Sequence, residues 1–450
     1  MNILFVMSDT FRKDHLACYG NKNIKTPHLD RFAQECVQFD NCYATSFPTL
    51  PMRADLFTGK FTFTYLGWQS LPAKETILAE LLQEAGYTTL GVVDTPFFCR
   101  RGYGFDRGFK DYKWILGQGN EERERFNSER CYEEDYCAPR TMTVAEKRLE
   151  YYYKEKFFLY VDTHDPHEPW DPPSWYVEPY YPGYDGKVVG PCYWDWREAG
   201  LKEEDVKIAH ACYCGEITMV DRWIGRLLDR VKSMGLWENT AIVFTSDHGF
   251  YFGEHGFFGK TRIMHRQTYS SPLYQEITRV PLFVYIPGIK PRRVRALVSL
   301  VDLMPTLLEL GGGKIPETVQ GKSLLSLLKG ETDIFRDFVV SSPPLYNPGD
   351  PSKIVDDKLR TVKEPHFSTI TTRKWTFLYS TENSPAQLYD IEKDPQESQN
   401  IIGQNWQVAE DLHQKFVELL EKVGTDERYL TPRKHLPKKR VFVSSPGLIL

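Results

Sequence analysis

The chain has little excess charge of either sign, because 56 Lys and Arg residues nearly balance 61 Asp and Glu residues, for a formal net charge of −5. Without a broad basic face, nucleic acid is not expected as a partner. The sequence also lacks a run of about 18 apolar residues, so no membrane span is expected. Its first residues pass directly into an apolar segment, and no basic region with a small-residue cleavage site precedes it, so no export signal is expected.

Cysteine is present, but not in patterns typical of a zinc site or a disulfide framework. The nine cysteines are an odd number and are scattered from Cys18 to Cys214. No pair has convincing zinc-ligand spacing. Cys212 and Cys214 fall in a predicted helix, where residues two apart face different sides. We therefore expect free thiols in a reducing compartment, and hence a cytoplasmic protein.

Short apolar segments alternate with amphipathic ones over most of the chain. The apolar segments, read as strands, are 2–8, 87–93, 157–161, 241–246 and 281–286. The amphipathic segments, read as helices, are 76–85, 206–231 and 303–310. This alternation predicts an α/β fold with a large, mostly parallel sheet covered by helices on both faces. In such a sheet the active site lies at the carboxyl ends of the strands.

Two stretches interrupt this pattern. Residues 112–150 are charged and show little periodicity, and residues 170–200 are rich in Pro, Tyr, Trp and Gly. We interpret both as insertions or long loops near the mouth of the site. From about residue 335, apolar and polar residues alternate as in antiparallel strands, and a final helix follows. We therefore divide the chain into a catalytic domain, 1–334, and a smaller C-terminal α+β subdomain with a tail, 335–450.

Acidic residues and histidines follow the predicted strands at the point where each strand ends. Asp9 ends the first strand, and Asp247 and His248 follow the strand at 241–246. A carboxylate in such a place is costly to bury unless it is paired or binds a cation. Two carboxylates and one imidazole suit Mn, Zn, Mg or Ca. Alternatively, these residues cap helices, and their positions alone leave both interpretations open.

A hydroxyl stands where a predicted helix begins. The segment Thr49-Leu-Pro-Met-Arg53 leads into this helix and places an arginine one turn after the threonine. The N-terminus of a helix offers N–H groups and a favourable dipole to an anion. The arginine is suited to hold a nucleophile or an oxyanion. A plain helix cap with an early proline remains the alternative.

Eight segments in order between residue 2 and about residue 401 resemble the motifs of sulfatases, a branch of the alkaline phosphatase superfamily. They include Asn2-Ile-Leu-Phe-Val-Met-Ser-Asp9, Thr49-Leu-Pro-Met-Arg53 with Leu56-Phe-Thr-Gly-Lys60, Asp165-Pro-His-Glu-Pro169, Thr245-Ser-Asp-His-Gly249, Gly259-Lys260, Arg279-Val-Pro-Leu282, Asp302-Leu-Met-Pro-Thr-Leu-Leu308 and Leu388-Tyr-Asp-Ile-Glu-Lys-Asp-Pro395. This order over nearly the whole chain makes a chance likeness negligible. The resemblance implies an alkaline-phosphatase-like or sulfatase-like fold.

The resemblance also implies a metal centre. Asp9, Asp247 and His248 would ligate one divalent metal ion, Mn, Ca, Zn or Mg. Thr49 stands at the nucleophile position and would also contact the metal. Arg53 would steady the nucleophile. Such a cation lowers the pKa of the nucleophile and polarises the anion.

Other residues would bind the substrate. His167 and Lys260 match the family residues that contact the transferred anion or the leaving oxygen. His164 is a further substrate-binding candidate. The Gly-Lys-Trp-His-Leu-Gly segment of the family is missing, and the chain has Gly91-Val-Val-Asp-Thr-Pro-Phe97 in its place. Asp94 or Thr95 would then replace the missing Lys and His and give a less cationic pocket.

Thr49 is the main departure from the family pattern. Sulfatases oxidise a Cys or Ser at this position to formylglycine, but oxidation of a threonine hydroxyl would give a ketone. A phosphate ester of threonine, by contrast, is an ordinary intermediate. Thr10 also replaces a common second aspartate, and His248 stands where many members have Asn. This ligand set resembles that of phosphonate monoester hydrolases and phosphodiesterases of the same branch, and Thr49 favours phosphoryl over sulfuryl transfer.

Three functions follow from these residues. The first is hydrolysis of a small-molecule phosphate or phosphonate ester through Thr49, and the second is hydrolysis of a sulfate ester without formylglycine. The third is a homologue that binds such an anion without turnover. One metal ion is favoured, and the candidates for a second are Asp162, His164, Asp165, His255 and His265. Self-association into a homo-oligomer is left open.

Overall fold

The computed structural model describes residues 1–116, 130–264, 267–353, 359–381 and 385–437. Within these ranges, nine strands form a central sheet in the order β12-β2-β13-β7-β1-β5-β3-β4, and β14 also pairs with β2. The strands are β1 (Asn2–Ser8), β2 (Val37–Tyr43), β3 (Thr88–Val93), β4 (Asp111–Trp114), β5 (Phe157–Thr163), β7 (Thr240–Thr245), β12 (Arg279–Val280), β13 (Leu282–Tyr285) and β14 (Arg292–Ser299). Neighbours from β7 to β4 are parallel. The predicted α/β fold is confirmed.

The sheet is mixed at the side where β13 lies. This strand matches the predicted segment 281–286 but runs antiparallel to both β7 and β2. Strands β2 and β14 were not predicted, and they pair in parallel with each other. Both strands have polar residues among the apolar ones, so neither shows the continuous apolar segment from which the other strands are predicted.

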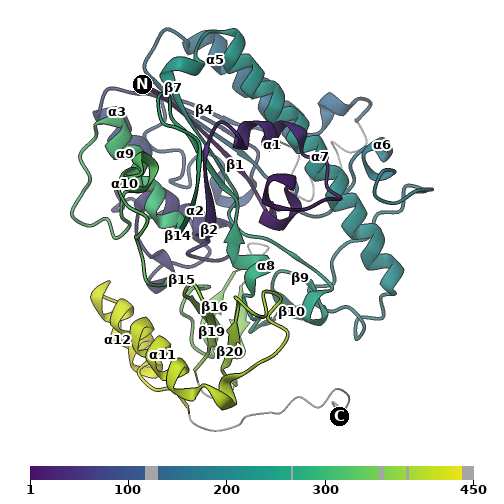
Figure 1. The fold of residues 1–450 in the computed structure, drawn as a ribbon, viewed down its shortest axis with the longest axis vertical. Coiled ribbons are helices and arrows are strands. Elements are labelled where there is room, and N and C mark those ends of the chain that lie inside the picture. The colour runs from purple at the N-terminus through teal and green to yellow at the C-terminus, as the bar shows by residue number, and fades with distance from the viewer. Residues whose placement is uncertain (117–129, 265–266, 354–358, 382–384, 438–450) are drawn as a thin grey trace.

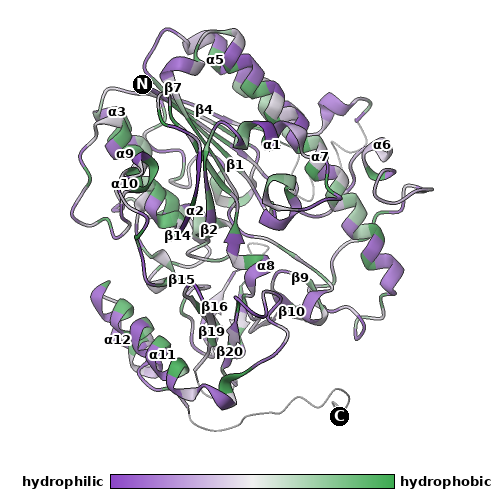
Figure 2. Cartoon of the chain, viewed as in Figure 1, coloured by the Kyte–Doolittle hydropathy of each residue, from purple (hydrophilic) through white to green (hydrophobic). Residues whose placement is uncertain are grey.

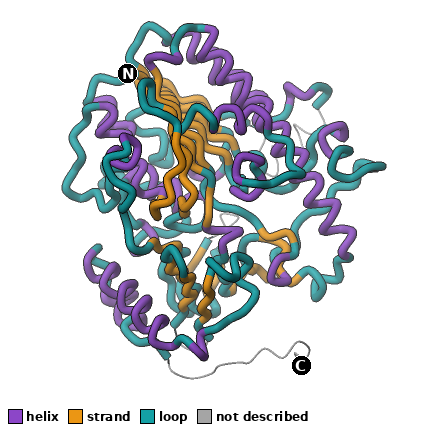
Figure 3. The backbone as a smooth tube through the Cα atoms, viewed as in Figure 1, coloured by secondary structure: helices purple, strands orange, loops and turns teal. Residues whose placement is uncertain are grey.

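Two hydrophobic cores cover the faces of the sheet, and β1 contributes to both. Leu4 and Val6 pack into one core, whereas Ile3, Phe5 and Met7 pack into the other. This division follows from the alternation of side chains along a strand. The helices over the first face are α1 (Pro27–Ala33), α5 (Cys137–Tyr152) and α7 (Glu203–Ser233), and those over the second are α2 (Thr49–Thr58), α3 (Leu78–Glu84), α9 (Leu303–Gly311) and α10 (Leu325–Lys329). The sheet stands between these two groups of helices (Figures 1 and 3).

One of the two predicted loop regions is wrong in part. Residues 112–150 contain the end of β4 and the helix α5, whose buried stripe includes Ala138, Met142 and Leu149. Hydrophilic residues alternate with this apolar stripe along α5, and they obscured the helical period (Figure 2). Residues 170–200 are mostly loop, as predicted, with only the short α6 (Ser174–Val177) and β6 (Trp194–Asp195).

The C-terminal part forms a smaller subdomain below the central sheet in Figure 1, as predicted. Its antiparallel sheet has the order β15-β18-β19-β20 and packs against α11. A second small sheet, β10-β11-β17-β16, joins strands from both sides of residue 335. These and the remaining elements are β8 (Tyr251–Phe252), β9 (Phe257–Gly259), β10 (Arg262–Met264), β11 (Gln267–Tyr269), α8 (Gln275–Thr278), β15 (Val339–Ser341), β16 (Pro351–Ser352), β17 (Arg360–Val362), β18 (Ser368–Thr371), β19 (Trp375–Tyr379), β20 (Gln387–Asp390), α11 (Trp406–Lys422) and α12 (Glu427–Leu430).

Two further expectations concern thiols and membranes. In the part of the chain that the structure describes, no two cysteines form a disulfide bond. Among the described residues, no helix combines the length and the apolar character that crossing a membrane requires.

Candidate functional site

Three adjacent parallel strands bring buried carboxylates to one edge of the sheet. Asp9 follows β1, Asp162 lies near the end of β5, and Asp247 follows β7. Strand β1 lies between the other two, with Met7 in register with both Asp162 and Thr245. All three aspartates are fully buried. Buried carboxylates so close together require positive charge, and the surrounding side chains show where it comes from.

Asp9, Asp247 and His248 form a candidate set of metal ligands. One donor atom from each lies within 4.8 Å of the others. His248 Nδ1 lies 3.0 Å from the carbonyl oxygen of Gly249 and donates to it, so Nε2 is left as the ligand atom. Asp9 Oδ2 is buried and has no hydrogen-bond partner. Although Arg53 Nη1 lies 3.1 Å away, this oxygen accepts no hydrogen bond, and together with the oxygen–nitrogen donor set it fits a divalent cation.

Thr10 holds this arrangement in place. Its hydroxyl donates to Asp9 Oδ1 at 2.6 Å, and its N–H donates to Asp247 Oδ1 at 2.9 Å. The backbone of Thr10 has a φ of 61°, in the left-handed region. A single residue therefore orients both carboxylates from a conformation that is unusual for a β-branched side chain.

Arg53 supplies positive charge between the aspartates. Its Nη1 lies 3.1 Å from Asp9 Oδ2 and donates to Asp247 Oδ2 at 2.7 Å. Its Nε and Nη2 each donate to one oxygen of Asp162 at 2.7 Å. Burial alone would lower the pKa of Arg53, but Asp162 and Asp247 hold that pKa well above its ordinary value. The guanidinium is therefore permanently charged.

Asp9 is likewise held in its charged form. Burial alone would raise the pKa of its carboxyl group, but the positive charge of Arg53 beside it holds that pKa below its ordinary value. Asp9 is thus a carboxylate over the whole physiological pH range, as a metal ligand must be.

Thr49 is the first residue of α2 and lies beside the three ligands. Its Oγ1 is 3.3 Å from His248 Nε2. Its carbonyl oxygen accepts a hydrogen bond of 3.1 Å from Arg53 Nη1, one helical turn later. The structure therefore brings together Thr49, Arg53 and the three candidate ligands in one buried cluster.

His167 and Lys260 also lie near Asp9. Lys260 Nζ is 2.5 Å from His167 Nε2, and it lies 3.3 Å from Glu168 Oε1. The carbonyl oxygen of Glu168 accepts a hydrogen bond of 2.8 Å from His167 Nδ1. Burial lowers the pKa of His167, so its ring is neutral and Nε2 accepts a hydrogen bond from Lys260 Nζ.

His164 lies against His167. Their rings stack at a centroid distance of 3.8 Å, and Asp9, His164 and His167 can also share an ion by geometry. Neither ring nitrogen of His164 has a hydrogen-bond partner. Burial, together with the positive charge of Lys260, holds the pKa of His164 well below its ordinary value. His164 therefore offers a neutral imidazole to the site.

Asp94 and Thr95 bond to the protein itself. Asp94 Oδ2 accepts hydrogen bonds from Thr141 and Thr163, and Asp94 Oδ1 accepts one of 2.5 Å from the N–H of His164. Burial and the nearby Asp165 raise the pKa of Asp94. Thr95 Oγ1 donates to Asp162 at 2.9 Å. Their predicted contact with substrate stays a prediction, and their visible contacts position His164 and Asp162.

The candidates for a second metal ion separate in space. Both oxygens of Asp162 accept from Arg53, and Asp165 Oδ2 accepts from the N–H of Ala138 at 3.0 Å. His255 lies elsewhere, stacked on Tyr274. Of this group, His164 lies beside Asp9 and the other candidate metal ligands. His265 lies outside the described residues.

Two residues of the site had no role assigned from the sequence. Glu168 accepts a hydrogen bond from the hydroxyl of Tyr193 and faces Lys260. Burial alone would raise the pKa of Glu168, but His167 and Lys260 lower it to about 2. Glu168 stands inside a recognised motif and could have been found there. Tyr193 comes from a loop with no sequence signal.

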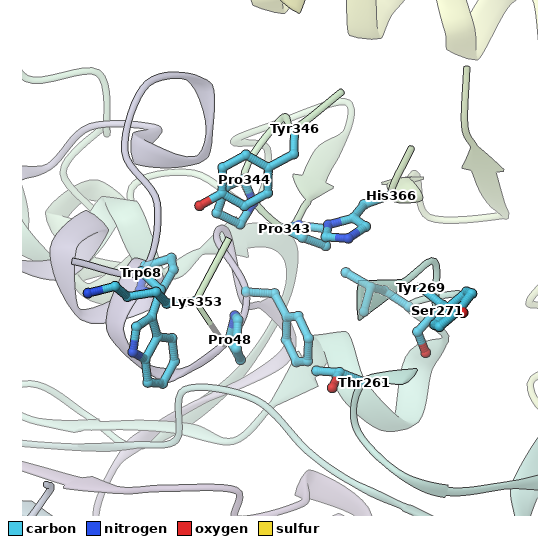
Figure 4. A pocket seen from close by; sticks show the side chains of 13 residues that line it. Pro48, Trp68, Thr261, Tyr269, Ser271, Pro343, Pro344, Tyr346, Lys353 and His366 are labelled. Atoms are coloured by element: carbon cyan, nitrogen blue, oxygen red, sulfur yellow. The ribbon is translucent and has the colours of Figure 1, made fainter. Parts of the chain in front are cut away.

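A small cavity adjoins the residues next to Thr49 and Lys260 in the chain. Its wall includes Pro48 and Thr261, which are the sequence neighbours of Thr49 and Lys260. Figure 4 shows Trp68 on one side and Tyr346 and His366 from the C-terminal part on the other. The cavity is mainly apolar and aromatic, and it is a candidate place for part of a substrate.

Comparison with known proteins gives a family for this architecture. The Sulfatase family model matches residues 1–313, and the model of the N-sulphoglucosamine sulphohydrolase C-terminal region matches residues 253–423. An ulvan-active sulfatase of Formosa agariphila is 28% identical, over 95% of this chain and 83% of that protein. An arylsulfatase of Clostridium perfringens is 27% identical, over 97% of each chain. The phosphonate monoester hydrolase of Agrobacterium radiobacter has the same fold, with a TM-score of 0.74 and 21% identity over 94% of this chain and 96% of that one.

Proposed function

Because the chain belongs to the sulfatase family, we propose that it hydrolyses phosphate or phosphonate esters, with Thr49 as the nucleophile beside a divalent metal ion. The position of Thr49 carries this proposal. Its hydroxyl is buried at the start of a helix, 3.3 Å from His248 Nε2 and next to the acidic ligands. A hydroxyl in this place is aligned for attack and shielded from bulk water.

The chemistry of threonine favours phosphorus over sulfur. Family members with formylglycine release sulfate when their hydrated aldehyde collapses, and a secondary alcohol cannot form that aldehyde. Thr49 must instead form an ester that water cleaves in a second step. Phosphate esters of hydroxyl side chains are ordinary intermediates of this kind. The solved phosphonate monoester hydrolase supports the proposal only in that this fold accommodates phosphorus chemistry.

Asp9, Asp247, His248 and Thr49 would hold the metal ion. The cation, Mn, Ca, Zn or Mg, would lower the pKa of the Thr49 hydroxyl and polarise the ester group. Asp9 Oδ2 accepts no hydrogen bond, and the His248 ring is already oriented through Nδ1, which suits both side chains to serve as ligands.

The other residues of the candidate site would position the reacting groups and supply a proton. Arg53 fixes the backbone of Thr49 and offsets the charge of the aspartates. As Thr49 Oγ1 forms its bond to phosphorus, the bond to the leaving oxygen breaks. Lys260, backed by His167, donates a proton to that oxygen. Water then cleaves the bond between phosphorus and Thr49, and free phosphate or phosphonate leaves.

Sulfate ester hydrolysis is the second candidate. The relatives at 28% and 27% identity are sulfatases by name, and the same residues could transfer a sulfuryl group to Thr49. A homologue that binds anions without turnover is the third. The simultaneous presence of the metal ligands, Arg53, His167 and Lys260 speaks against it.

A parallel assay tests these candidates. The Mn-loaded protein and its Thr49→Ala and Thr49→Ser variants are given an aryl sulfate, an aryl phosphate, a bis-aryl phosphodiester and an aryl phosphonate monoester. We expect a phosphorus ester to dominate, Thr49→Ala to lose activity and Thr49→Ser to keep part of it. Mass spectrometry of acid-quenched enzyme should find phosphate on Thr49. Cleavage of the sulfate alone would overturn the proposal in favour of a sulfatase without formylglycine.

A further inference from the structure

A second group of metal-ligating side chains lies outside the catalytic site, between α7 and the loop after β1. His15 Nε2, His210 Nε2 and Cys214 Sγ lie within 4.8 Å of one another. His210 and Cys214 are four residues apart on α7, so they share one face of the helix. His15 comes from the short 3-10 turn Lys13–His15. We propose that these three residues bind a zinc ion.

The ligand types and distances fit this ion. Two imidazoles and one thiolate favour zinc, whereas Mg and Ca prefer oxygen ligands. The distance from His15 Nε2 to His210 Nε2 is 2.8 Å, and that from Cys214 Sγ to His210 Nε2 is 3.8 Å. Ordinary zinc bond lengths in a tetrahedron give about 3.3 Å and about 3.6 Å for these separations. The two rings need to part by roughly half an ångström, which side-chain rotation supplies.

Neighbouring residues already orient the imidazoles. His15 Nδ1 lies 2.9 Å from Asp14 Oδ1, and Arg12 holds the other oxygen of Asp14. A carboxylate on the far nitrogen of a ligating histidine fixes its tautomer and leaves Nε2 with a lone pair. The ring of Tyr213 packs edge-on against His15 at 5.2 Å, and Phe252 packs against His210 at the same distance.

The cluster also faces space for a fourth ligand. His15, His210 and Cys214 line an open cavity of about 650 Å³, which a water molecule or a small external ligand can enter. Burial raises the pKa of the Cys214 thiol to about 12, so the free thiol keeps its proton. Zinc binding forms the sulfur–zinc bond and releases that one proton to solvent, while both imidazoles bind as neutral rings.

The site is linked to the catalytic loop. The hydroxyl of Tyr213, on α7, donates to the carbonyl oxygen of Thr10 at 2.7 Å and accepts from the N–H of Arg12 at 2.9 Å. Zinc on His15 and α7 would add a second connection between this helix and the loop that begins at Asp9. We therefore assign the ion a structural role, and its loss should lower activity by less than tenfold.

Cobalt substitution tests the proposal with a readout other than activity. The candidate ligands of the catalytic metal include no thiolate, so a sulfur-to-cobalt charge-transfer band reports the second site. Cys212→Ser is the matched control, because Cys212 is also buried on α7 but points to Tyr184. We expect the band, and one more zinc per chain, in wild type and Cys212→Ser, and loss of both in Cys214→Ser and His210→Ala.

Either of two results would overturn the zinc site. One is a wild-type protein without the charge-transfer band, and the other is equal zinc content in wild type and both serine variants. Circular dichroism establishes that each variant is folded. His210 is only partly buried, so His210→Ala remains informative if Cys214→Ser does not fold.

Discussion

The two halves of the candidate active site are built from different parts of the chain. In the metal half, Asp9, Asp162 and Asp247 stand at the ends of paired strands, and Arg53 binds all three at distances of 2.7–3.1 Å. In the half that would face the leaving group, His167 follows β5 and Lys260 follows β9. The first half is held by the sheet and the second by a network of side chains. We expect substitutions in the first to affect stability and those in the second to affect the reaction.

Arg53→Met should have the largest effect. The substitution removes the positive charge among three buried carboxylates, and breaking such a pair costs about 3–5 kcal/mol. We expect a loss of that order in the free energy of unfolding of metal-free protein, measured by urea denaturation. Arg293→Met is the control, since its exposed ion pair with Asp40 is worth only about 0–1 kcal/mol. Equal losses in the two variants would show that the buried charge of Arg53 does not stabilise the metal half.

Lys260→Met should act on the reaction instead. Loss of a general acid typically costs about 10²–10⁴ in rate, and the loss grows as the leaving group becomes more basic. We expect kcat to fall far more for an alkyl ester than for a nitrophenyl ester, with metal content unchanged. Lys187→Met, in an exposed pair with Asp205, serves as the control. A loss independent of the leaving group would assign Lys260 to binding alone.

Glu168→Gln should change the pH dependence of stability. The folded pKa of Glu168, about 2, lies below its ordinary value of 4.5, so its contribution is present above about pH 4.5 and is lost as the pH falls toward 2. The free energy of unfolding of metal-free wild type should therefore fall more steeply between neutral pH and about pH 3 than that of the variant. If the free energy of unfolding had the same pH dependence in both proteins, Lys260 and His167 would not lower the pKa of Glu168 in the folded state.

Tyr193→Phe should have the smallest effect. It keeps the ring but removes the hydroxyl that donates to Glu168. A hydrogen bond to a charged group contributes about 1.5–3 kcal/mol, and water can replace part of it in this loop, so we expect a loss near the lower end. Urea denaturation gives the stability, and the pH profile of kcat/KM shows whether Lys260 is disturbed. A rate loss as large as that of Lys260→Met would contradict a supporting role.

Much of the metal half could be predicted because strand ends carry their own signal. Asp9 and Asp247 directly follow apolar segments, and parallel strands place their carboxyl ends at one edge. The structure also shows what that reasoning left open. Asp162 also lies near the end of a strand, but both of its carboxylate oxygens accept hydrogen bonds from Arg53 of α2. Sequence position identifies a buried charge but not its partner.

The remaining parts depend on contacts between distant segments. Helix α5 was read as loop because its surface is charged, and its buried face became visible only against the sheet. Tyr193 contacts Glu168 at a sequence separation of 25 residues, and His15 contacts His210 at a separation of 195 residues. No periodic pattern in the local sequence predicts such long-range contacts. The pair His210 and Cys214 had a helical spacing that could have been recognised, but its third partner could not.

The left-handed backbone of Thr10 implies a conflict between the stability of the fold and its activity. A non-glycine residue in this region costs roughly 1–3 kcal/mol, and Thr10 carries that cost while its N–H and hydroxyl orient Asp247 and Asp9. Glycine would relieve the backbone but remove the hydroxyl. Selection for heat resistance alone would therefore tend to discard this residue, whereas selection for turnover would retain it. Thr10 is a position where an engineered, hardier enzyme would be expected to become a slower one.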